Sequence, residues 1–320
     1  MIDIIIAAYN AQNTIADTLY SIAQQSKVED INVYIVNDNP ENNYTEIVNK
    51  FKKYFKIKEL KMKKNMGPGE ASNYGIKNSK GKYIVFIDSD DMFHNYLSIQ
   101  ILFEAIEERN ADVIGSSFIE EIDFNNYSIR SNKLIWNHGK IYRRSFIEDN
   151  NIYFSNEKSN EDLFFNFLLN LSGAKIEFID DVTYVWQKND NSITRKNENE
   201  YRYKALQGYN NNIYKLSLEE EKRNLSKNGV AKYVFFGLLQ MYYTYLSFLN
   251  ANEEEYARNL LLATKQNMKK FIELQGYLMK EDANDIIREE IQNNMGNDLE
   301  ILVLPHISFY EFIDRGLNCE

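Results

Sequence analysis

Three carboxylates fall within four residues, at Asp88, Asp90 and Asp91, directly after the apolar run Tyr83–Ile87. Such a run is typical of a buried strand, so the carboxylates stand at its carboxyl end, where open α/β sheets bind ligands. Carboxylates this close repel one another unless a cation lies between them, and Mg2+ and Mn2+ take oxygen ligands from carboxylates and phosphates. The cluster therefore predicts a metal-diphosphate site. The alternative is a solvated acidic turn before the next helix.

A second acidic pair, Glu161 and Asp162, stands at the start of an apolar segment, Asp162–Leu171, that reads as a helix. A carboxylate held there could act as a general base toward a nearby hydroxyl group. The alternative is a pair that only complements the positive end of the helix dipole.

Polar residues also follow the first two apolar runs of the chain. Ala7 and Ala8 are small enough for a flat ring to approach the backbone, and Tyr9 could stack on such a ring. Asp38 follows Ile31–Val36 and could accept a hydrogen bond from an N–H of the ring. The alternative for Asp38 is a turn carboxylate before Pro40.

Strand-like and helix-like segments alternate over the first ninety residues. We expect strands at Ile2–Ala8, Ile31–Val36, Lys56–Met62 and Tyr83–Ile87, and helices at Asn13–Gln25, Thr45–Tyr54 and Pro68–Asn78. This alternation predicts βαβ units with right-handed crossovers. The expected fold is therefore α/β, Rossmann-like, with a mostly parallel sheet flanked by helices.

The next hundred residues continue the mixed pattern, and the remainder is helical. A helix is expected at Leu97–Arg109 and a strand at Asp112–Ile119; Ile129–Trp136 and Ile141–Phe146 flank a turn at Gly139 and Lys140; two short strands follow at Ile176–Ile179 and Thr183–Trp186. We place a domain boundary near residue 200, with a domain at 1–200 and a helical domain at 201–320. Within the second, Val234, Leu238, Met241, Tyr245 and Leu249 form one helical stripe. That domain is expected to flank an acceptor cleft or to form a dimer contact.

Composition narrows the class of protein. The chain has 320 residues and a net charge of −10, which disfavours nucleic acid as a partner. Its only cysteine is Cys319, so an internal disulfide is excluded, which fits a reducing compartment. With neither a signal peptide nor a transmembrane span expected, the prediction is a cytoplasmic protein, with peripheral attachment to the inner face of the membrane as an alternative.

Five basic or titratable residues receive less specific interpretations. His94, His138 and His306 are far apart and lack zinc-site spacing, so ordinary polar roles are expected. Arg143 and Arg144 are interpreted as a solvated face or as contacts to an anionic acceptor.

Taken in order, the motifs resemble those of family 2 glycosyltransferases with the GT-A fold, over roughly residues 1–200. They are Ile4–Asn10, Tyr34–Asp38, Asn65–Gly75, Gly81–Asp91, Gly139–Arg144, Glu161-Asp162 and Asn191–Thr194. Each motif is weak alone, but their order and spacing together are specific.

The resemblance implies a role for each matching position. Tyr9 and Asp38 would face a nucleobase, Asp88 the ribose, and Asp90, with Asp88, a Mn2+ or Mg2+ ion that bridges the diphosphate. Asp162 would be the catalytic base and Glu161 would position hydroxyl groups beside it. The remaining expected donor-site residues are Ala7, Asn65, Gly67, Ser89 and Arg195.

The chain also departs from the family pattern. Asn37 stands where a carboxylate is usual, and Gln187 and Asn189 replace an Arg and a His that touch the diphosphate or metal. Lys188 or Arg195 is expected to supply the missing positive charge.

The resulting prediction is an inverting, metal-dependent glycosyltransferase. It would move a sugar from a nucleotide-sugar donor, with UDP favoured, to an acceptor hydroxyl in glycan or cell-surface polysaccharide synthesis. The acceptor would be a glycan, a lipid-linked molecule or a protein. One alternative is a non-catalytic module that binds a sugar nucleotide or glycan on a GT-A scaffold. A nucleotidyltransferase is the other, but it normally needs a Gly-rich basic loop that the segment 7–11 lacks.

Overall fold

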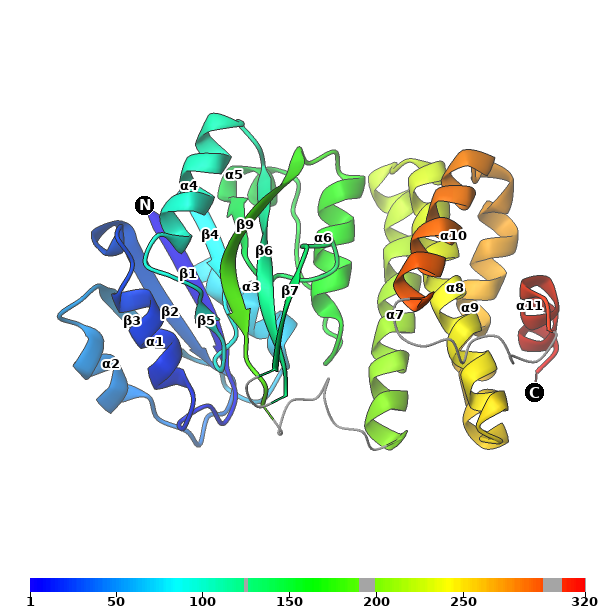
Figure 1. The fold of residues 1–320 in the computed structure, drawn as a ribbon, viewed down its shortest axis with the longest axis horizontal. Helices are drawn as coiled ribbons and strands as arrows, with labels where there is room; N and C mark the ends of the chain where they lie inside the picture. The colour runs from blue at the N-terminus through cyan, green and yellow to red at the C-terminus, as the bar shows by residue number, and fades with distance from the viewer. Residues whose placement is uncertain (124–125, 190–198, 296–306, 320) are drawn as a thin grey trace. The chain divides into compact units, whose positions relative to one another are not determined.

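The computed structural model describes residues 1–123, 126–189, 199–295 and 307–319. The chain divides into two compact units, Met1–Arg195 and Lys196–Glu320, which Figure 1 shows as an α/β part and a helical part. Because each unit has its own core, each is described by itself.

A nine-stranded mixed sheet forms the centre of the first unit, in the order β3-β2-β1-β4-β8-β6-β9-β5, with β7 paired to β6. The strands are β1 (Ile2–Ala8), β2 (Ile31–Asn37), β3 (Lys56–Lys61), β4 (Tyr83–Phe86), β5 (Met92–Phe93), β6 (Val113–Asp123), β7 (Asn126–Arg130), β8 (Lys140–Arg143) and β9 (Ile176–Trp186). Strands β3, β2, β1 and β4 are parallel neighbours, whereas β8 runs antiparallel to both β4 and β6. The carboxyl ends of β1, β2 and β4 therefore meet at one edge.

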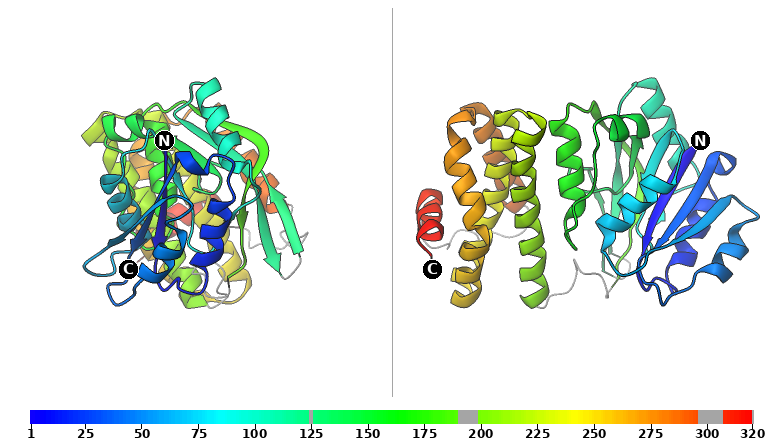
Figure 2. Two further views of the ribbon diagram at one scale, coloured as in Figure 1. Left: turned by 90° about the vertical axis from the view of Figure 1, so that its left-hand side faces the viewer. Right: turned by 180° about the vertical axis from the view of Figure 1, so that it is seen from behind.

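Six helices cover the two faces of this sheet. They are α1 (Ile15–Ala23), α2 (Thr45–Phe51), α3 (Pro68–Asn78), α4 (Ser98–Glu108), α5 (Arg144–Asp149) and α6 (Glu161–Leu171); a short 3-10 helix, η1, spans Val28–Asp30. Helices α1, α2 and α4 pack on the face that carries Ile2, Ile4 and Ile6 of β1. Helix α3 lies on the opposite face (Figure 2), where Gly75 approaches Ile5 so closely that a Cβ there would lie 2.5 Å from its side chain.

A buried ion pair joins the beginning of the chain to the first residue of α5. The Arg144 side chain is 8% exposed, and its Nη2 lies 3.1 Å from Asp3 Oδ2. The guanidinium also donates to the Ile76 carbonyl and to Ser79 Oγ. The interpretation of Arg144 as a solvated or acceptor-binding residue is therefore wrong, because every one of these contacts is internal.

The second unit consists of helices α7 (Asn199–Arg223), α8 (Lys227–Asn250), α9 (Glu254–Leu274), α10 (Lys280–Met295) and α11 (Phe309–Asn318), with a 3-10 helix, η2, at Gln275–Tyr277. Four of the five residues in the predicted stripe of α8 are buried, all except Leu249. Helix α11 packs closely on α9, since Gly316 leaves room for the Met268 side chain. Within the described residues, no helix is long and apolar enough to cross a bilayer.

The α/β fold class predicted from the sequence is confirmed, as the comparisons reported below also show. One local difference concerns β9, because the two predicted short strands form a single strand. Exposed Asp180 and Asp181 interrupt its apolar pattern, while the backbone continues beside β6 through a register shift.

Candidate active site at the strand ends

The turn Asp88–Asp91 leaves β4 at the carboxyl edge and is tied to the end of β9. Asp91 is 1% exposed, and its two carboxylate oxygens accept hydrogen bonds from Tyr184 Oη at 2.6 Å and from the Gln187 N–H at 2.8 Å. Asp90 accepts from Asn189 Nδ2 at 2.7 Å. Burial raises the pKa of Asp91 well above its usual range, and the neighbouring Asp88 and Asp90 carboxylates raise it further.

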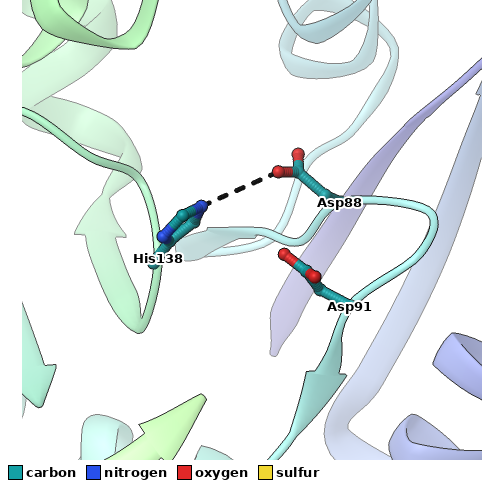
Figure 3. A group of neighbouring side chains, drawn as sticks. All are labelled: Asp88, Asp91 and His138. Carbon is teal, nitrogen blue, oxygen red and sulfur yellow. Dashed lines mark ion pairs between the residues drawn. The ribbon is translucent and has the colours of Figure 1, made fainter. Parts of the chain in front are cut away.

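The Asp88 side chain is 65% exposed and points toward His138, which lies in the loop before β8. His138 Nε2 lies 3.8 Å from Asp88 Oδ2, as Figure 3 shows. Among the described residues, Asp88, Asp91 and His138 each offer a ligand atom within 4.8 Å of the others. Sequence reasoning assigned His138 only an ordinary polar role. The signal that could have found it is its place directly before Gly139-Lys140, where a family motif begins.

Helix α6 brings the second acidic pair to the same place. Asn160 precedes it in a left-handed conformation, with φ of 56°, and Asp162 Oδ1 accepts the Leu163 N–H at 2.9 Å. Burial raises the pKa of Asp162 to about 6, while the nearby His138 pulls it downward and Asp88 pushes it up. Burial also raises the pKa of Glu161, to about 8, followed by repulsion from Asp162. These mutual effects place the predicted base, His138 and the exposed Asp88 in one electrostatic cluster.

A buried lysine holds the loop that carries His138. Lys140 is fully buried, and its Nζ donates to Asn132 Oδ1 at 2.8 Å, to the Lys133 carbonyl at 2.7 Å and to the Trp136 carbonyl. Burial lowers the pKa of Lys140 to about 7, which the Asp162 carboxylate partly opposes. The Lys140 side chain therefore holds the loop 131–139 in place through these hydrogen bonds. Sequence reasoning did not assign it this role.

The expected nucleobase residues lie at the ends of β1 and β2. Tyr9 is 55% exposed, whereas Asp38 is 3% exposed. The Asp38 oxygens accept the Met66 and Gly67 N–H groups, each at 2.8 Å, so this carboxylate braces the turn before α3. The contact of Asp38 with a nucleobase stays a prediction.

The other expected donor-site residues vary in exposure. Asn65 is exposed, Gly67 is buried with φ of 93°, and Ala7 and Ser89 are half-buried. Arg195 and the motif at residues 191–194 lie outside the described residues.

The donor set fits a divalent cation. Asp88 and Asp90 offer carboxylate oxygens, and four acidic residues of the cluster (Asp90, Asp91, Glu161 and Asp162) have raised pKa values, burial being the largest cause each time. Nδ1 of His138 is buried without a hydrogen-bond partner. Excess negative charge is what a bound cation would offset, and the Nε2 of His138 that faces Asp88 is a further ligand atom within reach.

Comparison with known proteins agrees with this geometry. Residues 3–158 match the family model "Glycosyl transferase family 2". The chain is 29% identical over 205 residues to the poly(ribitol-phosphate) beta-N-acetylglucosaminyltransferase TarS of Staphylococcus aureus, which covers 57% of this chain and 35% of that relative. The chain thus spans about a third of that relative's length.

Two solved structures share the fold. Residues 1–349 of S. aureus TarS, in complex with UDP-GlcNAc, superpose with a TM-score of 0.64 at 20% identity, covering 92% of both chains. The mannosyltransferase PcManGT of Pyrobaculum calidifontis, in complex with GDP-Man and Mn2+, gives a TM-score of 0.54 at 12% identity, over 92% of this chain and 80% of that one. The resemblance seen in the sequence is confirmed: residues 3–158 match the family 2 glycosyltransferase domain, and the α/β unit shares the GT-A fold of these neighbours.

Proposed function

We propose that this chain is an inverting glycosyltransferase that moves a sugar from a UDP-linked donor to a hydroxyl group of a surface polysaccharide. The observation that carries the proposal is the gathering of Asp88, His138 and Asp162, which come from three separate segments, at one edge of the sheet. A nucleotide-binding edge and a candidate base meet there, which transfer chemistry requires.

Asp162 is the proposed general base. Its pKa of about 6 lies near neutral pH, so the carboxylate is ionised there and still basic enough to take a proton from an acceptor hydroxyl. The oxygen of that hydroxyl attacks the anomeric carbon while the bond to the nucleoside diphosphate breaks. One in-line displacement inverts the configuration at that carbon. Glu161, with its pKa raised to about 8, is protonated at neutral pH and can donate a hydrogen bond to a sugar hydroxyl.

Asp88 and Asp90 are the proposed holders of a divalent cation, Mn2+ or Mg2+. When bound, such a cation supplies positive charge against the diphosphate that departs. The chain's own part is to fix those carboxylates: Asn189 orients Asp90, and Asp91 ties the whole turn to Tyr184 and Gln187.

The choice of donor and acceptor rests on the relatives. TarS was solved with UDP-GlcNAc and with UDP, and two relatives are named as poly(ribitol-phosphate) sugar transferases. A polyol-phosphate polymer or a similar wall glycan is therefore the proposed acceptor, and a UDP-sugar the proposed donor.

The first test is a melting screen with UDP, GDP, CDP and TDP and their common sugars, each with and without Mn2+. A ligand that binds only the folded state raises the melting temperature, by an amount that grows with its concentration relative to Kd. We expect the largest rise for a uridine nucleotide in the presence of Mn2+. The best donor is then incubated with poly(ribitol-phosphate), and released UDP is measured.

Asp162→Asn serves as the matched control in this assay. It should bind the same nucleotide and release no UDP above background. Binding without turnover in the native protein, over a panel of acceptors, would instead favour a sugar-nucleotide-binding module.

A further inference from the structure

We propose that His138 is a nitrogen ligand of the divalent cation, beside Asp88. This inference rests on the proposed function, because it refines the metal site on which nucleotide binding is expected to depend. It starts from one side chain that is packed in a fixed orientation, with its Nε2 facing the exposed Asp88 carboxylate.

The imidazole of His138 is held in one orientation by aromatic rings. It stacks on Tyr184 with centroids 5.0 Å apart and planes 15° apart, and it lies parallel to Trp136 at 6.5 Å. Phe118 meets its ring edge-on at 5.3 Å, and Trp186 lies 5.2 Å away. A ring packed this tightly has little freedom to turn, so its nitrogens point where the fold directs them.

Neither ring nitrogen of His138 makes a hydrogen bond within the described residues. The residue is 8% exposed, and Nδ1 is buried with no hydrogen-bond partner within the described part of the chain. An unsatisfied buried polar atom is unfavourable by roughly 1–3 kcal/mol, and most such atoms have partners. Nε2 lies 3.8 Å from Asp88 Oδ2, which is too long for a hydrogen bond.

The same separation suits a shared cation. Mg2+ and ions of similar size bind oxygen at about 2.0–2.1 Å, so two ligand atoms up to roughly 4 Å apart can contact one ion. Figure 3 shows the imidazole edge and the Asp88 carboxylate facing each other across this space. Asp91 closes one side of it, but its oxygens already accept hydrogen bonds from Tyr184 and Gln187. Asp88 and His138 are therefore the free donors.

The backbone around His138 is built to hold this position. Asn132 Nδ2 donates to the His138 carbonyl at 2.6 Å and to the Ser116 carbonyl at 2.7 Å, while Lys140 fixes the preceding residues from below. Gly139 follows with φ of 58°, and a Cβ there would lie 2.6 Å from Ser116 Oγ. The loop can make this turn only with glycine, so the imidazole is preorganised rather than recruited by the ion.

The chemistry of the donor atoms then sets the choice of metal. Mg2+ takes oxygen ligands and keeps several waters, whereas an imidazole nitrogen suits transition-metal ions. A site that combines Asp88 oxygen with His138 nitrogen is therefore not one built for Mg2+ alone.

The test uses the full chain and Mn2+ alone, without nucleotide. Free Mn2+ is titrated by electron paramagnetic resonance, and bound Mn2+ is examined for spin-echo modulation by nitrogen. We expect nitrogen modulation in the native protein that changes when histidine carries 15N. His138→Phe keeps an aromatic ring in the stack but should lose the modulation and bind Mn2+ roughly tenfold or more weakly. His94→Gln, which alters an exposed histidine, is the matched control and should leave both unchanged.

Several outcomes would overturn the inference. They are native protein that binds no Mn2+, bound Mn2+ without nitrogen modulation, and a folded His138→Phe that keeps native Mn2+ affinity. If His138→Phe binds UDP more weakly than the native protein in EDTA but binds Mn2+ equally well, His138 contacts the diphosphate and not the cation. If His138→Phe does not fold, as judged by circular dichroism in EDTA, the 15N-histidine experiment on the native protein decides alone.

The result is separable from the proposed function. Nitrogen modulation without any sugar transfer would support His138 as a metal ligand and contradict the proposed enzyme activity. Sugar transfer without nitrogen modulation would support the activity and contradict His138 as a ligand.

Discussion

The candidate site of the α/β unit and the helical unit treat buried charge in opposite ways. In the α/β unit, acidic groups accumulate: burial raises the pKa of Asp91, Glu161 and Asp162, and neighbouring carboxylates add to the effect. In the helical unit, Glu219 is also buried, but hydrogen bonds from Lys222 and Arg223 outweigh the burial and lower its pKa. The first arrangement leaves charge uncompensated, and the second neutralises it locally.

Buried amide and hydroxyl groups of α7 and α9 pair with one another in the same local way, although Asn267 Oδ1 lacks a hydrogen-bond partner within the described residues. Asn210 donates to Thr264 Oγ1 at 3.0 Å, and Asn267 donates to the Asn210 carbonyl at 2.8 Å, all within two packed helices. Uncompensated charge of the kind seen around Asp162 is unfavourable for folding and is typical of sites that bind or react. The contrast indicates that the chemistry belongs to the α/β unit and that the buried polar groups of the helical unit stabilise its packing.

The sharpest way to break this comparison is to neutralise one carboxylate in each unit. Asp162→Asn should lower the rate of transfer by about 10³-fold, because a general base contributes roughly 10²–10⁴-fold, and nucleotide binding should survive. Glu219→Gln should leave kcat unchanged although it removes charge-assisted hydrogen bonds. Released UDP and the nucleotide-induced rise in melting temperature measure the two effects. Lost nucleotide binding in Asp162→Asn would count against the role as base.

The pH dependence of transfer is the next largest effect. Because the pKa of Asp162 is about 6, the ionised base should be fully formed above pH 7. Below pH 6 the rate should fall about tenfold for each pH unit, as the proportion of ionised carboxylate falls. Initial rates at saturating donor between pH 4.5 and 8.5 test this. A flat profile across pH 6 would remove Asp162 from the proton-transfer step.

Lys140 offers a structural test within the α/β unit. Lys140→Met keeps most of the side-chain volume but leaves three oxygen acceptors of the loop 131–139 without their donor, so we expect a loss of about 2 kcal/mol in the free energy of unfolding. Transfer should also fall, because His138 is carried by that loop. Urea denaturation measures the stability. Lys58→Met, on an exposed strand position, is the control and should change it by less than about 0.5 kcal/mol. Equal effects of the two substitutions would show that Lys140 does not anchor the loop.

These residues also show how far the sequence alone could lead. The strands that end at Tyr9, Asp38 and Asp88 were predictable because apolar runs and parallel crossovers force their carboxyl ends to one edge. The Asp88–Asp91 turn and the start of α6 followed from the same logic, together with the family resemblance. The assignment of catalytic and metal-binding roles to individual residues remains a prediction.

His138 and Lys140 could not be found in that way. The loop 131–139 has no strand partner, and its carbonyls are satisfied by the Lys140 ammonium group from a neighbouring strand. These contacts are short in sequence, but an irregular loop that folds back onto a lysine has no periodic pattern that would predict them. Similarly, nothing in the sequence around Asp91 reveals that its carboxylate accepts a hydrogen bond from Tyr184, almost a hundred residues away. Tertiary contacts decided these positions.

In the helical unit, a smaller effect is expected from Asn267→Leu. The substitution keeps the size of the side chain but removes its donation to Asn210, so the free energy of unfolding should fall by about 1 kcal/mol. Because the change lies in a region that pairs its polar groups locally, kcat should be unchanged under conditions where the variant is folded. A fall in kcat at full occupancy of the folded state would connect this network to catalysis and weaken the contrast between the units.

The last effect concerns how the stability of the metal-free protein changes with pH. It tests whether the Glu161 carboxylate is unfavourable in the folded protein. The pKa of Glu161 is about 8 in the folded protein against 4.5 ordinarily, so between these values the folded chain retains a proton that the unfolded chain releases. Stability from this group is therefore fully present below pH 4.5 and is lost as pH rises toward 8. Glu161→Gln resembles the protonated form at every pH. In EDTA, the variant should melt with the native protein near pH 4.5 and above it at pH 8, by a margin that grows as the pH rises between these values. If the native protein instead gains on the variant as pH rises, the Glu161 carboxylate is stabilised by partners, as Glu219 is, and the opposition between the two units does not hold at this residue.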